Sequence, residues 1–176
     1  MQRPRRRWLA VLLLWPLASL ANEVDIPELG IRLTQLPAGA SKPQVSARAA
    51  GYEATTRLGP AVLDVYREDV PAPAGSDVAD PKYRALLDQK FGKTLESKAQ
   101  GAPTDVGGHS GWTVVDLRDA RSATDYTCVT YVIVDQHLYR LMVSAGGSDG
   151  RPPEFDALVK ALSGVTFEQV QRANRG

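Results

Sequence analysis

Cys128 and the two histidines are the residues whose types best suit nucleophilic chemistry, because a thiolate nucleophile needs a base within hydrogen-bond reach. A two-residue turn would pair Val134 with His137 across a hairpin. Cys128 then lies six residues further along its strand from Val134, about 20 Å away at ~3.3 Å per residue. The order of the predicted strands places His109 near the other end of the same strand, also too far from the thiol. The spacing therefore predicts no Cys–His dyad, and Cys128 is expected to be a small buried apolar residue.

Ser148 is the candidate for serine chemistry. The run Gly146-x-Ser148-x-Gly150 matches the pattern of a hydrolase nucleophile elbow and lies between a predicted strand and a predicted helix. However, Pro152-Pro153 intervenes before the helix, and no histidine follows Ser148 in the sequence. A flexible connector is the preferred interpretation, and a serine hydrolase is the weakest of the functions considered.

The other polar residues do not form a metal or cofactor motif. A zinc site needs three or four converging Cys, His or carboxylate ligands, which two distant histidines and one thiol do not supply. The glycine-rich run 107–111 leads into a strand and not into a helix N-terminus, so it is not expected to hold phosphate. The carboxylate pairs Asp116/Asp119 and Glu68/Asp69 are expected in solvent, at turns and strand ends. We therefore expect no metal, no cofactor and no catalytic residue.

One short segment carries residues typical of surface recognition. His109, Ser110 and Trp112 stand beside glycines, and tryptophan is a frequent anchor of protein interfaces. We predict these three as partner-binding residues. The competing interpretation, which the sequence favours for Trp112, is that its ring covers the edge of the sheet.

The elements that position these residues are mostly strands, as the alternation of apolar and polar residues indicates. In the first half, segment 22–28 is expected to be a polar start, and strands are predicted at 30–36, 45–49, 52–58 and 61–67, the last two as a hairpin. In the second half, segment 100–111 is expected to be a loop, and a three-stranded meander is predicted at 112–117, 126–134 and 137–143, with a final short strand at 165–167. Both faces of the 126–143 hairpin are largely apolar, so the sheet needs cover on both sides.

Two helices are predicted to supply that cover. The first begins with Asp80 as N-cap and Pro81 at N1, and its apolar face comprises Tyr83, Leu87, Phe91 and Leu95. The second begins at Pro152-Pro153, turns Phe155, Leu158, Val159 and Leu162 inward, and ends at Ser163-Gly164. The predicted fold is therefore α+β, a mostly antiparallel sheet covered by helices on both faces in an α/β/α-type sandwich.

Four segments of the second half resemble the PsbP-like fold group, which includes extrinsic photosystem proteins and their bacterial and nuclear-import relatives. These are Gly108–Trp112 opening a strand, Tyr126–Tyr131, the hairpin return His137–Leu141, and the helix and strand at 155–167. As architecture, the resemblance extends over residues 30–168 and is a pattern of hydrophobic residues. It implies a binding or assembly accessory without catalysis, and it transfers no functional residues.

The first 21 residues have the pattern of a secretory signal peptide. Four arginines at positions 3, 5, 6 and 7 precede the apolar run 8–17, and small residues at Ser19 and Ala21 favour cleavage between Ala21 and Asn22. Because the apolar run is shorter than the roughly 18 residues of a membrane-spanning helix, cleavage is preferred over a retained anchor. Residues 22–168 are expected to form a single domain, followed by a polar tail at 169–176.

The charge and the cysteine count limit the function further. Without the four leader arginines the chain keeps 17 basic and 20 acidic residues, and this net charge of −3 disfavours nonspecific nucleic-acid binding. One cysteine cannot form an internal disulfide, so the domain must be stabilised by its apolar core. We therefore predict an exported, non-enzymatic accessory of the bacterial envelope, periplasmic or secreted, that binds a protein or a small ligand and has no stable membrane anchor. The alternative is a periplasmic immunity-type inhibitor of a delivered toxin enzyme.

Overall fold

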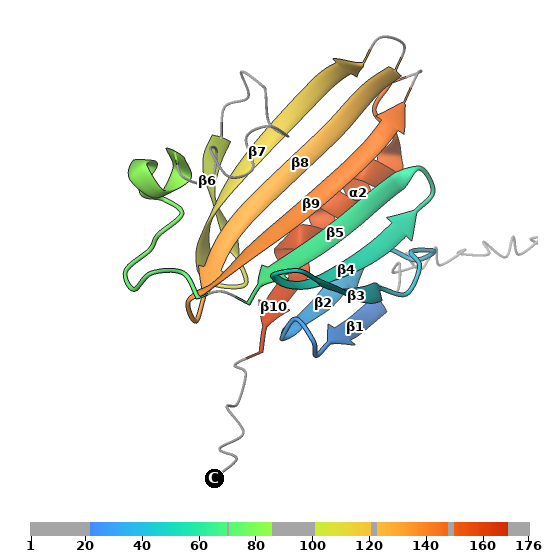
Figure 1. Cartoon of the computed structure of the whole chain (residues 1–176). Helices are drawn as coiled ribbons and strands as arrows, with labels where there is room; N and C mark the ends of the chain where they lie inside the picture. Colours follow the sequence, from blue (N-terminus) through green and yellow to red (C-terminus); the bar gives the residue numbers. More distant parts are fainter. Residues whose placement is uncertain (1–21, 70, 86–100, 121–122, 148–149, 169–176) are drawn as a thin grey trace, which may run out of the picture.

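The computed structural model describes residues 22–69, 71–85, 101–120, 123–147 and 150–168, with only the backbone at 116–120 and 123–125. Strands dominate this part of the chain and form two antiparallel sheets (Figure 1). The larger sheet has seven strands in the order β3-β4-β5-β9-β8-β7-β6, and the smaller has three in the order β1-β2-β10. The predicted signal peptide and the C-terminal tail lie outside the described residues.

The β7–β8–β9 meander is confirmed and forms half of the large sheet. Its strands are longer than the sequence indicated: β7 spans His109–Ala120, β8 spans Ala123–Val134 and β9 spans His137–Gly147. The turn residues Asp135 and Gln136 have φ values of 48° and 67°. Two positive φ angles are those of a type I′ hairpin turn, which fixes the register. The predicted pairs Val134 with His137 and Cys128 with Val143 are both observed.

The first half supplies three further strands of this sheet. The predicted hairpin is present as β4 and β5, and β5 pairs with β9, so the two halves form one continuous sheet. The bounds are Gln44–Arg48 for β3, Gly51–Leu58 for β4 and Ala61–Glu68 for β5.

The prediction of a loop at 100–111 is wrong. Gly101–Val106 forms β6, which pairs antiparallel with the start of β7 through a turn at Gly107 and Gly108, both at positive φ. The glycines and Pro103 hide this strand in the sequence, because both residue types are typical of loops. An edge strand tolerates a proline, since the missing N–H can face solvent.

The polar start at 22–28 is also wrong, because Asn22–Ile26 forms β1 and pairs with β2, Ile31–Leu36. The final strand β10, Val165–Phe167, is confirmed and pairs with the other side of β2. The chain ends of the domain thus meet in the small sheet. Polar side chains on β1 mask the strand signal, since this edge strand exposes most of its residues.

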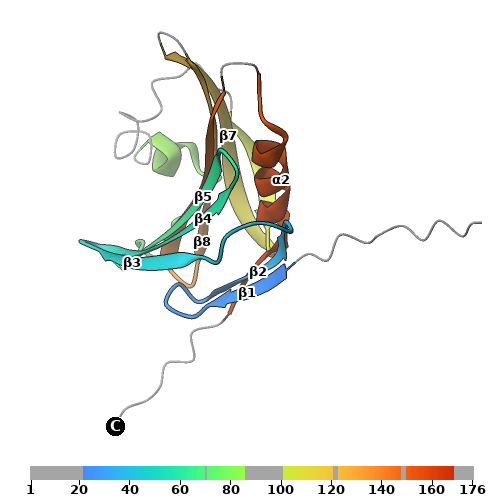
Figure 2. The ribbon, with the colours of Figure 1, turned by 90° about the vertical axis from the view of Figure 1, so that its right-hand side faces the viewer.

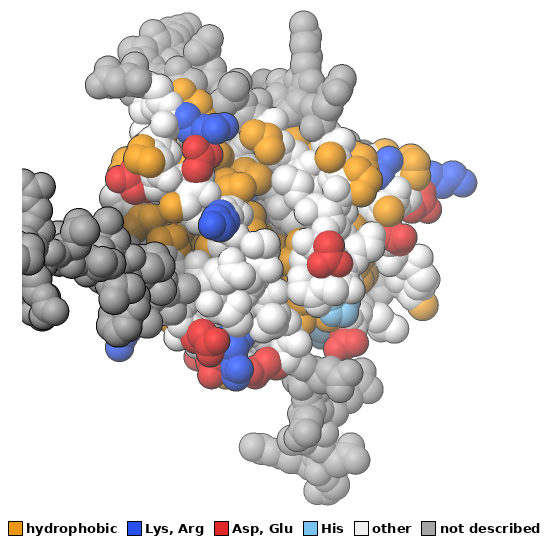
Figure 3. Space-filling model, turned by 180° about the vertical axis from the view of Figure 1, so that it is seen from behind, with side chains coloured by type: hydrophobic (Ala, Val, Ile, Leu, Met, Phe, Trp, Pro, Cys, Tyr) orange, Lys and Arg blue, Asp and Glu red, His pale blue; other side chains and the backbone are white. Residues whose placement is uncertain are grey.

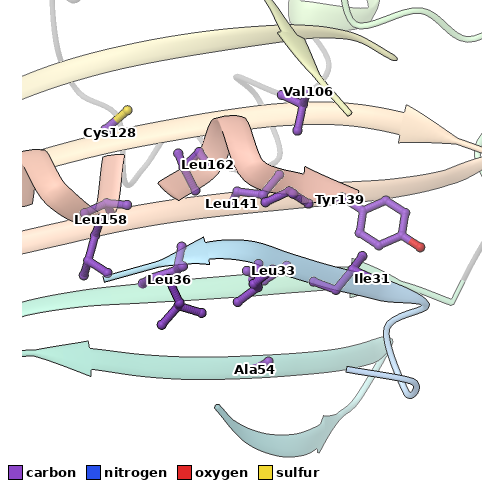
Figure 4. Packing of buried hydrophobic residues seen from close by; sticks show 14 of the residues in the cluster. Ile31, Leu33, Leu36, Ala54, Val106, Cys128, Tyr139, Leu141, Leu158 and Leu162 are labelled. Carbon is purple, nitrogen blue, oxygen red and sulfur yellow. The ribbon is translucent and has the colours of Figure 1, made fainter. Parts of the chain in front are cut away.

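One face of the large sheet is covered by α2, Pro153–Ala161, together with the small sheet (Figure 2). Phe155, Leu158 and Ala161 of α2 are buried, and a short 3-10 helix η1, Leu162–Gly164, leads into β10. Figure 4 shows buried side chains of β2, β9 and α2 meeting in this layer. This cluster, the main core, includes Ile31, Leu33, Leu36, Leu63, Val65, Leu141, Val143, Phe155, Leu158 and Val165.

The opposite face, called here the outer face, shows that the α/β/α-type sandwich is a wrong prediction. It is covered in part by segment 71–85, whose described helix is one short turn at 81–85 (Figure 2). A small cluster packs there, formed by Val78, Val129, Tyr131 and Leu138. The apolar pattern correctly indicated burial on both faces of β8 and β9, but an irregular segment provides much of the cover on the outer face. The fold is two antiparallel sheets with short helices.

The predicted start of the first helix is observed. The Asp80 carboxylate accepts a hydrogen bond from the Lys82 amide at 2.8 Å, as expected of an N-cap, and the Arg84 amide donates to the Asp80 carbonyl at 3.0 Å. Tyr83 packs against the small cluster. The rest of the predicted apolar stripe, Leu87, Phe91 and Leu95, lies outside the described residues.

Candidate functional site

Cys128 lies in the middle of β8, opposite Val115 on β7 and Val143 on β9, and is 1% exposed. Burial raises the pKa of its thiol to about 11, which suppresses the reactive thiolate at neutral pH. His137 pairs with Val134 at the far end of this strand. His109 lies at that same end and not at the opposite one as predicted, because Gly111 pairs with Val132. The sequence-based separation of the thiol from both imidazoles therefore holds.

We expect native Cys128 to react with iodoacetamide at pH 8 about 100-fold more slowly than the unfolded chain. The thiolate is the nucleophile, and a rise of the pKa from 9.0 to about 11 lowers the thiolate fraction by roughly that factor. Mass spectrometry with and without 6 M urea measures both rates. Comparable rates in the two states would contradict the buried position.

The three predicted partner-binding residues do not share one surface. His109, on the α2 side of β7, contacts the ring of Phe167 edge-on with a centroid distance of 5.3 Å. Ser110 is exposed on the outer face, where Trp112 also lies, because side chains alternate along a strand. Trp112 is half-buried beneath the Arg84 guanidinium, 3.8 Å from the ring centroid. Its indole occupies the space that a Cβ at Gly101 would need, 2.0 Å from Nε1, so Trp112 covers the β6 edge as the sequence favoured.

The remaining predicted sites are placed as follows. Ser148 lies outside the described residues, as do the side chains of Asp116 and Asp119. Gly107 and Gly108 form a turn between two strands. In the described part of the chain, no group of three His, Cys, Asp or Glu residues is arranged to hold a metal ion.

A row of aromatic and arginine side chains crosses the outer face and was not predicted. The register pairs Tyr66 with Arg140, Arg140 with Tyr131, and Tyr131 with Trp112. These four residues, the aromatic–arginine row, therefore lie in one line across β5, β9, β8 and β7. The Arg140 guanidinium lies over the Tyr66 ring at 5.5 Å from its centroid, and Arg84 stacks on Trp112 at the other end. Cation–π contacts of this kind hold each guanidinium against its ring.

Glu68 lies beside the aromatic–arginine row and is 8% exposed, so the expectation that it lies in solvent is wrong. Burial raises the pKa of Tyr66, the charge of Glu68 raises it further, and the charge of Arg140 acts in the opposite direction. Burial and then Glu68 likewise raise the pKa of Tyr83. Both phenols are therefore protonated at neutral pH and can donate hydrogen bonds. In this structure the Tyr66 hydroxyl donates one to the Ala50 carbonyl at 2.9 Å.

Segment 71–85 packs on part of the outer face, where Val78 clusters with Val129, Tyr131 and Leu138. Tyr66, Arg140 and Trp112 are half-buried, whereas Tyr131 is 4% exposed beneath its neighbours. The opposite side of the molecule, seen in Figure 3, carries acidic and basic side chains scattered among hydrophobic ones. The arrangement on the outer face presents planar aromatic and guanidinium surfaces and can bind a partner, but it brings together no nucleophile and base.

The sequence contained a signal for this row that periodicity alone could have detected. Tyr131 and Arg140 are on the same face of the predicted 126–143 hairpin, and Tyr66 is on the adjacent predicted strand. The pairing of β5 with β9, which completes the row, joins segments about 70 residues apart in the chain. A pattern confined to one hairpin cannot supply that pairing.

No known protein-family profile matches this chain, and no curated protein matches it in sequence. Among solved structures, LpqN, described as involved in cell envelope biogenesis of Mycobacterium tuberculosis, is similar with a TM-score of 0.46 and 16% identity over 84% of this chain and 90% of LpqN. PA94 from Pseudomonas aeruginosa, a protein of unknown function, is similar with a TM-score of 0.43 and 10% identity over 81% of this chain and 93% of that one. Similarities of this extent assign no function. Neither protein is described as PsbP-like, so that resemblance stays a prediction.

Helices long and apolar enough to span a membrane are not found among the residues that the structure describes. The predicted leader at 1–21, which contains the apolar run 8–17, lies outside these residues.

Proposed function

We propose that this protein is an exported, non-enzymatic accessory of the bacterial envelope that binds a protein partner through the outer face of its large sheet. The observation that carries the proposal is the aromatic–arginine row, which places Tyr66, Arg140 and Trp112 in one line on a partly open face. Tyrosine, tryptophan and arginine are the residue types enriched at the energetic centres of protein interfaces. All three side chains take part in cation–π contacts that hold them in place, so binding would cost less conformational entropy.

Two further observations support the proposal. The leader pattern at 1–21 favours export, and the predicted net charge of −3 after cleavage disfavours nucleic acid as the partner. The one thiol is buried with a raised pKa and lies far along its strand from both histidines, which supports a non-enzymatic role.

A photo-crosslinker in place of Tyr66 is expected to trap one discrete partner when the full chain is expressed in its native envelope. In that background, Arg140→Lys is expected to reduce the adduct at least tenfold. The crosslinker is a phenylalanine derivative, so it keeps an aromatic ring at position 66. Lysine keeps the charge but loses the planar guanidinium that stacks on the native ring at this position, and a hot-spot residue is worth about 2 kcal/mol or more. Gel shift and mass spectrometry of the adduct give both readouts.

The matched control places the same crosslinker at Val115. This residue is 48% exposed and lies on the opposite face of the same sheet, because it pairs with Cys128 of the main core. No adduct with that partner is expected from position 115. An adduct of equal yield from both positions, or no adduct from position 66 in exported protein, would overturn the proposal. A thermal melt of Arg140→Lys checks that its loss of binding does not reflect unfolding.

A further inference from the structure

The free edges of the two sheets differ in how they are protected against pairing with another strand. Natural edge strands avoid such pairing by proline, charges, irregularities or short length. In this structure, β6 contains Pro103, β10 has three residues, and β1 carries Glu23 and Asp25 with a register irregularity. β3 has no proline, no register irregularity and no unpaired charge. Its sequence QVSAR lacks proline, and its single charge, Arg48, is paired with Glu53 of its own hairpin.

The side chains of β3 are solvent-exposed. All five residues are exposed, and Val45 at 38% is, with Val115, one of two exposed large hydrophobic residues in the described part of the chain. β3 pairs on one side with β4 and is the end strand of the seven-stranded sheet. Figure 2 shows it projecting from the body of the molecule.

The direction of the backbone groups on β3 follows from the register. The backbone groups of Arg57 in β4 point toward the β3 side, because the Arg57 carbonyl accepts a hydrogen bond from the Ser41 amide at 2.8 Å. Alternation along β4 then directs Thr55 and Glu53 toward β3, where they pair with Gln44 and Ser46. The N–H and C=O groups of the residues between, Val45 and Ala47, point to the open edge.

We infer that β3 is the contact edge of a two-fold symmetric homodimer, in which the β3 strands of two copies pair antiparallel about Ser46. In this register Val45 pairs with Ala47 of the second copy, and each such pair exchanges both backbone hydrogen bonds, so all outward groups of the two strands are satisfied. If the two-fold axis passed through Val45 instead, Ala47 would pair with Pro43 of the second copy. Proline has no N–H, so one backbone hydrogen bond of each such pair would be lost. A shift to Ala47 would set Val45 against Ala49 in the turn.

The side chains are compatible with this two-fold register. Val45 and Ala47 lie on the core side of the sheet, since they pair with Ala54 and Tyr52, and they would extend that apolar layer across the dyad. Arg48 would stand opposite Gln44 of the second copy, so no like charges face each other. Five residues a side bury less than the ~1,200 Å² of a stable interface, so the dimer is expected to be weak, with a Kd on the order of 10–100 µM.

Disulfide trapping of the purified full chain tests this register directly. Ser46→Cys would place two thiols in a non-hydrogen-bonded antiparallel pair with Cα atoms ~4.5 Å apart, within the range of a disulfide. We expect mild oxidation at about 50 µM protein to yield covalent dimer at least tenfold faster than for Ala47→Cys. That control cysteine is equally exposed, but its copies would lie diagonally, ~7–8 Å apart. The native Cys128 is buried and does not contribute.

Two further variants separate pairing from chance collision. Ala47→Pro in the Ser46→Cys protein removes an outward N–H, leaves the β4 ladder intact and is expected to abolish trapping. Val45→Lys is expected to shift sedimentation toward monomer, whereas Val115→Lys, which charges the other exposed valine, is not. Equal trapping rates for Ser46→Cys and Ala47→Cys, or a monomer at all concentrations up to about 500 µM, would overturn the inference. Because no partner is present in this test, its failure would leave the proposed function of the outer face untouched.

Discussion

Replacing Leu141 with alanine is expected to lower the free energy of unfolding by about 3–5 kcal/mol. Leu141 is 0% exposed in β9, between Val65 of β5 and Thr130 of β8, and it belongs to the main core. Truncation removes buried apolar atoms and leaves a cavity, because strands on both sides prevent collapse. Urea unfolding with an unchanged m-value measures the loss, and a domain of this size should melt roughly 6–15 °C lower.

The matched control is Leu138→Ala on the same strand. Leu138 is also buried, at 3%, but it faces the outer side and packs in a cluster of four buried residues bordered by half-buried ones. Partly exposed neighbours can close over a truncated side chain, so we expect a loss near the lower end for leucine, about 2 kcal/mol. If Leu138→Ala proved the more damaging change, the outer face and not the α2 side would be the stabilising layer of the domain.

The parts of the fold that local pattern determines were predictable from the sequence. The hairpin from β8 to β9 has a two-residue turn between two largely apolar runs, so even its residue pairs were correct. The same holds for α2, whose proline start and inward face of Phe155 and Leu158 are both visible in the sequence. These elements bury a continuous face, and burial is what periodicity records.

The wrong predictions concern edge strands and the segments that cover the sheet from far along the chain. The periodicity of apolar residues gives little information on either. β1 and β6 each bury only one residue, so burial leaves no clear apolar–polar alternation in their sequences. A sheet apolar on both sides requires cover, but it does not specify a helix, and on the outer face Val78 comes from an irregular segment. The prediction of an α/β/α-type sandwich was wrong because it assumed that only helices can cover a sheet face.

The candidate site depended on the same long-range information. Trp112 was identified by residue type. Its position on the outer face and its contact with Arg84 could not be predicted, because they depend on the β6–β7 hairpin and on the helical turn at 81–85. Arg140 looked like an ordinary polar residue on a hairpin until the pairing of β5 with β9 placed Tyr66 beside it. Grouping His109 with Trp112 overlooked strand alternation, which sends the two side chains to opposite faces.

Gly51→Ala is expected to cost at least about 3 kcal/mol of unfolding free energy, although one methyl group is added. Gly51 has a φ of +153°, which is essentially restricted to glycine, and an added Cβ would lie 1.9 Å from the Arg67 carbonyl oxygen. The obstacle is backbone of the neighbouring strand β5 and cannot rotate away. The hairpin of β3 and β4 must therefore separate locally from β5. Urea unfolding would detect this, as would the exchange of the Asp69 amide, which donates to the Ala50 carbonyl at 3.0 Å.

Gly75→Ala is the control that isolates the clash from the backbone angle. Gly75 also has a positive φ, +80°, but a Cβ there meets no atom within 4 Å, so about 1 kcal/mol is expected. Equal losses for the two variants would show that the angle alone matters and that β4 can move away from β5 at little cost. A larger loss at Gly51 should also weaken the Tyr66 hydrogen bond to Ala50, since Ala50 precedes Gly51 directly. In that case Gly51→Ala would weaken partner binding by the chain with native Tyr66 as well as lower its stability, because one close backbone contact positions both the β3 edge and the end of the aromatic–arginine row.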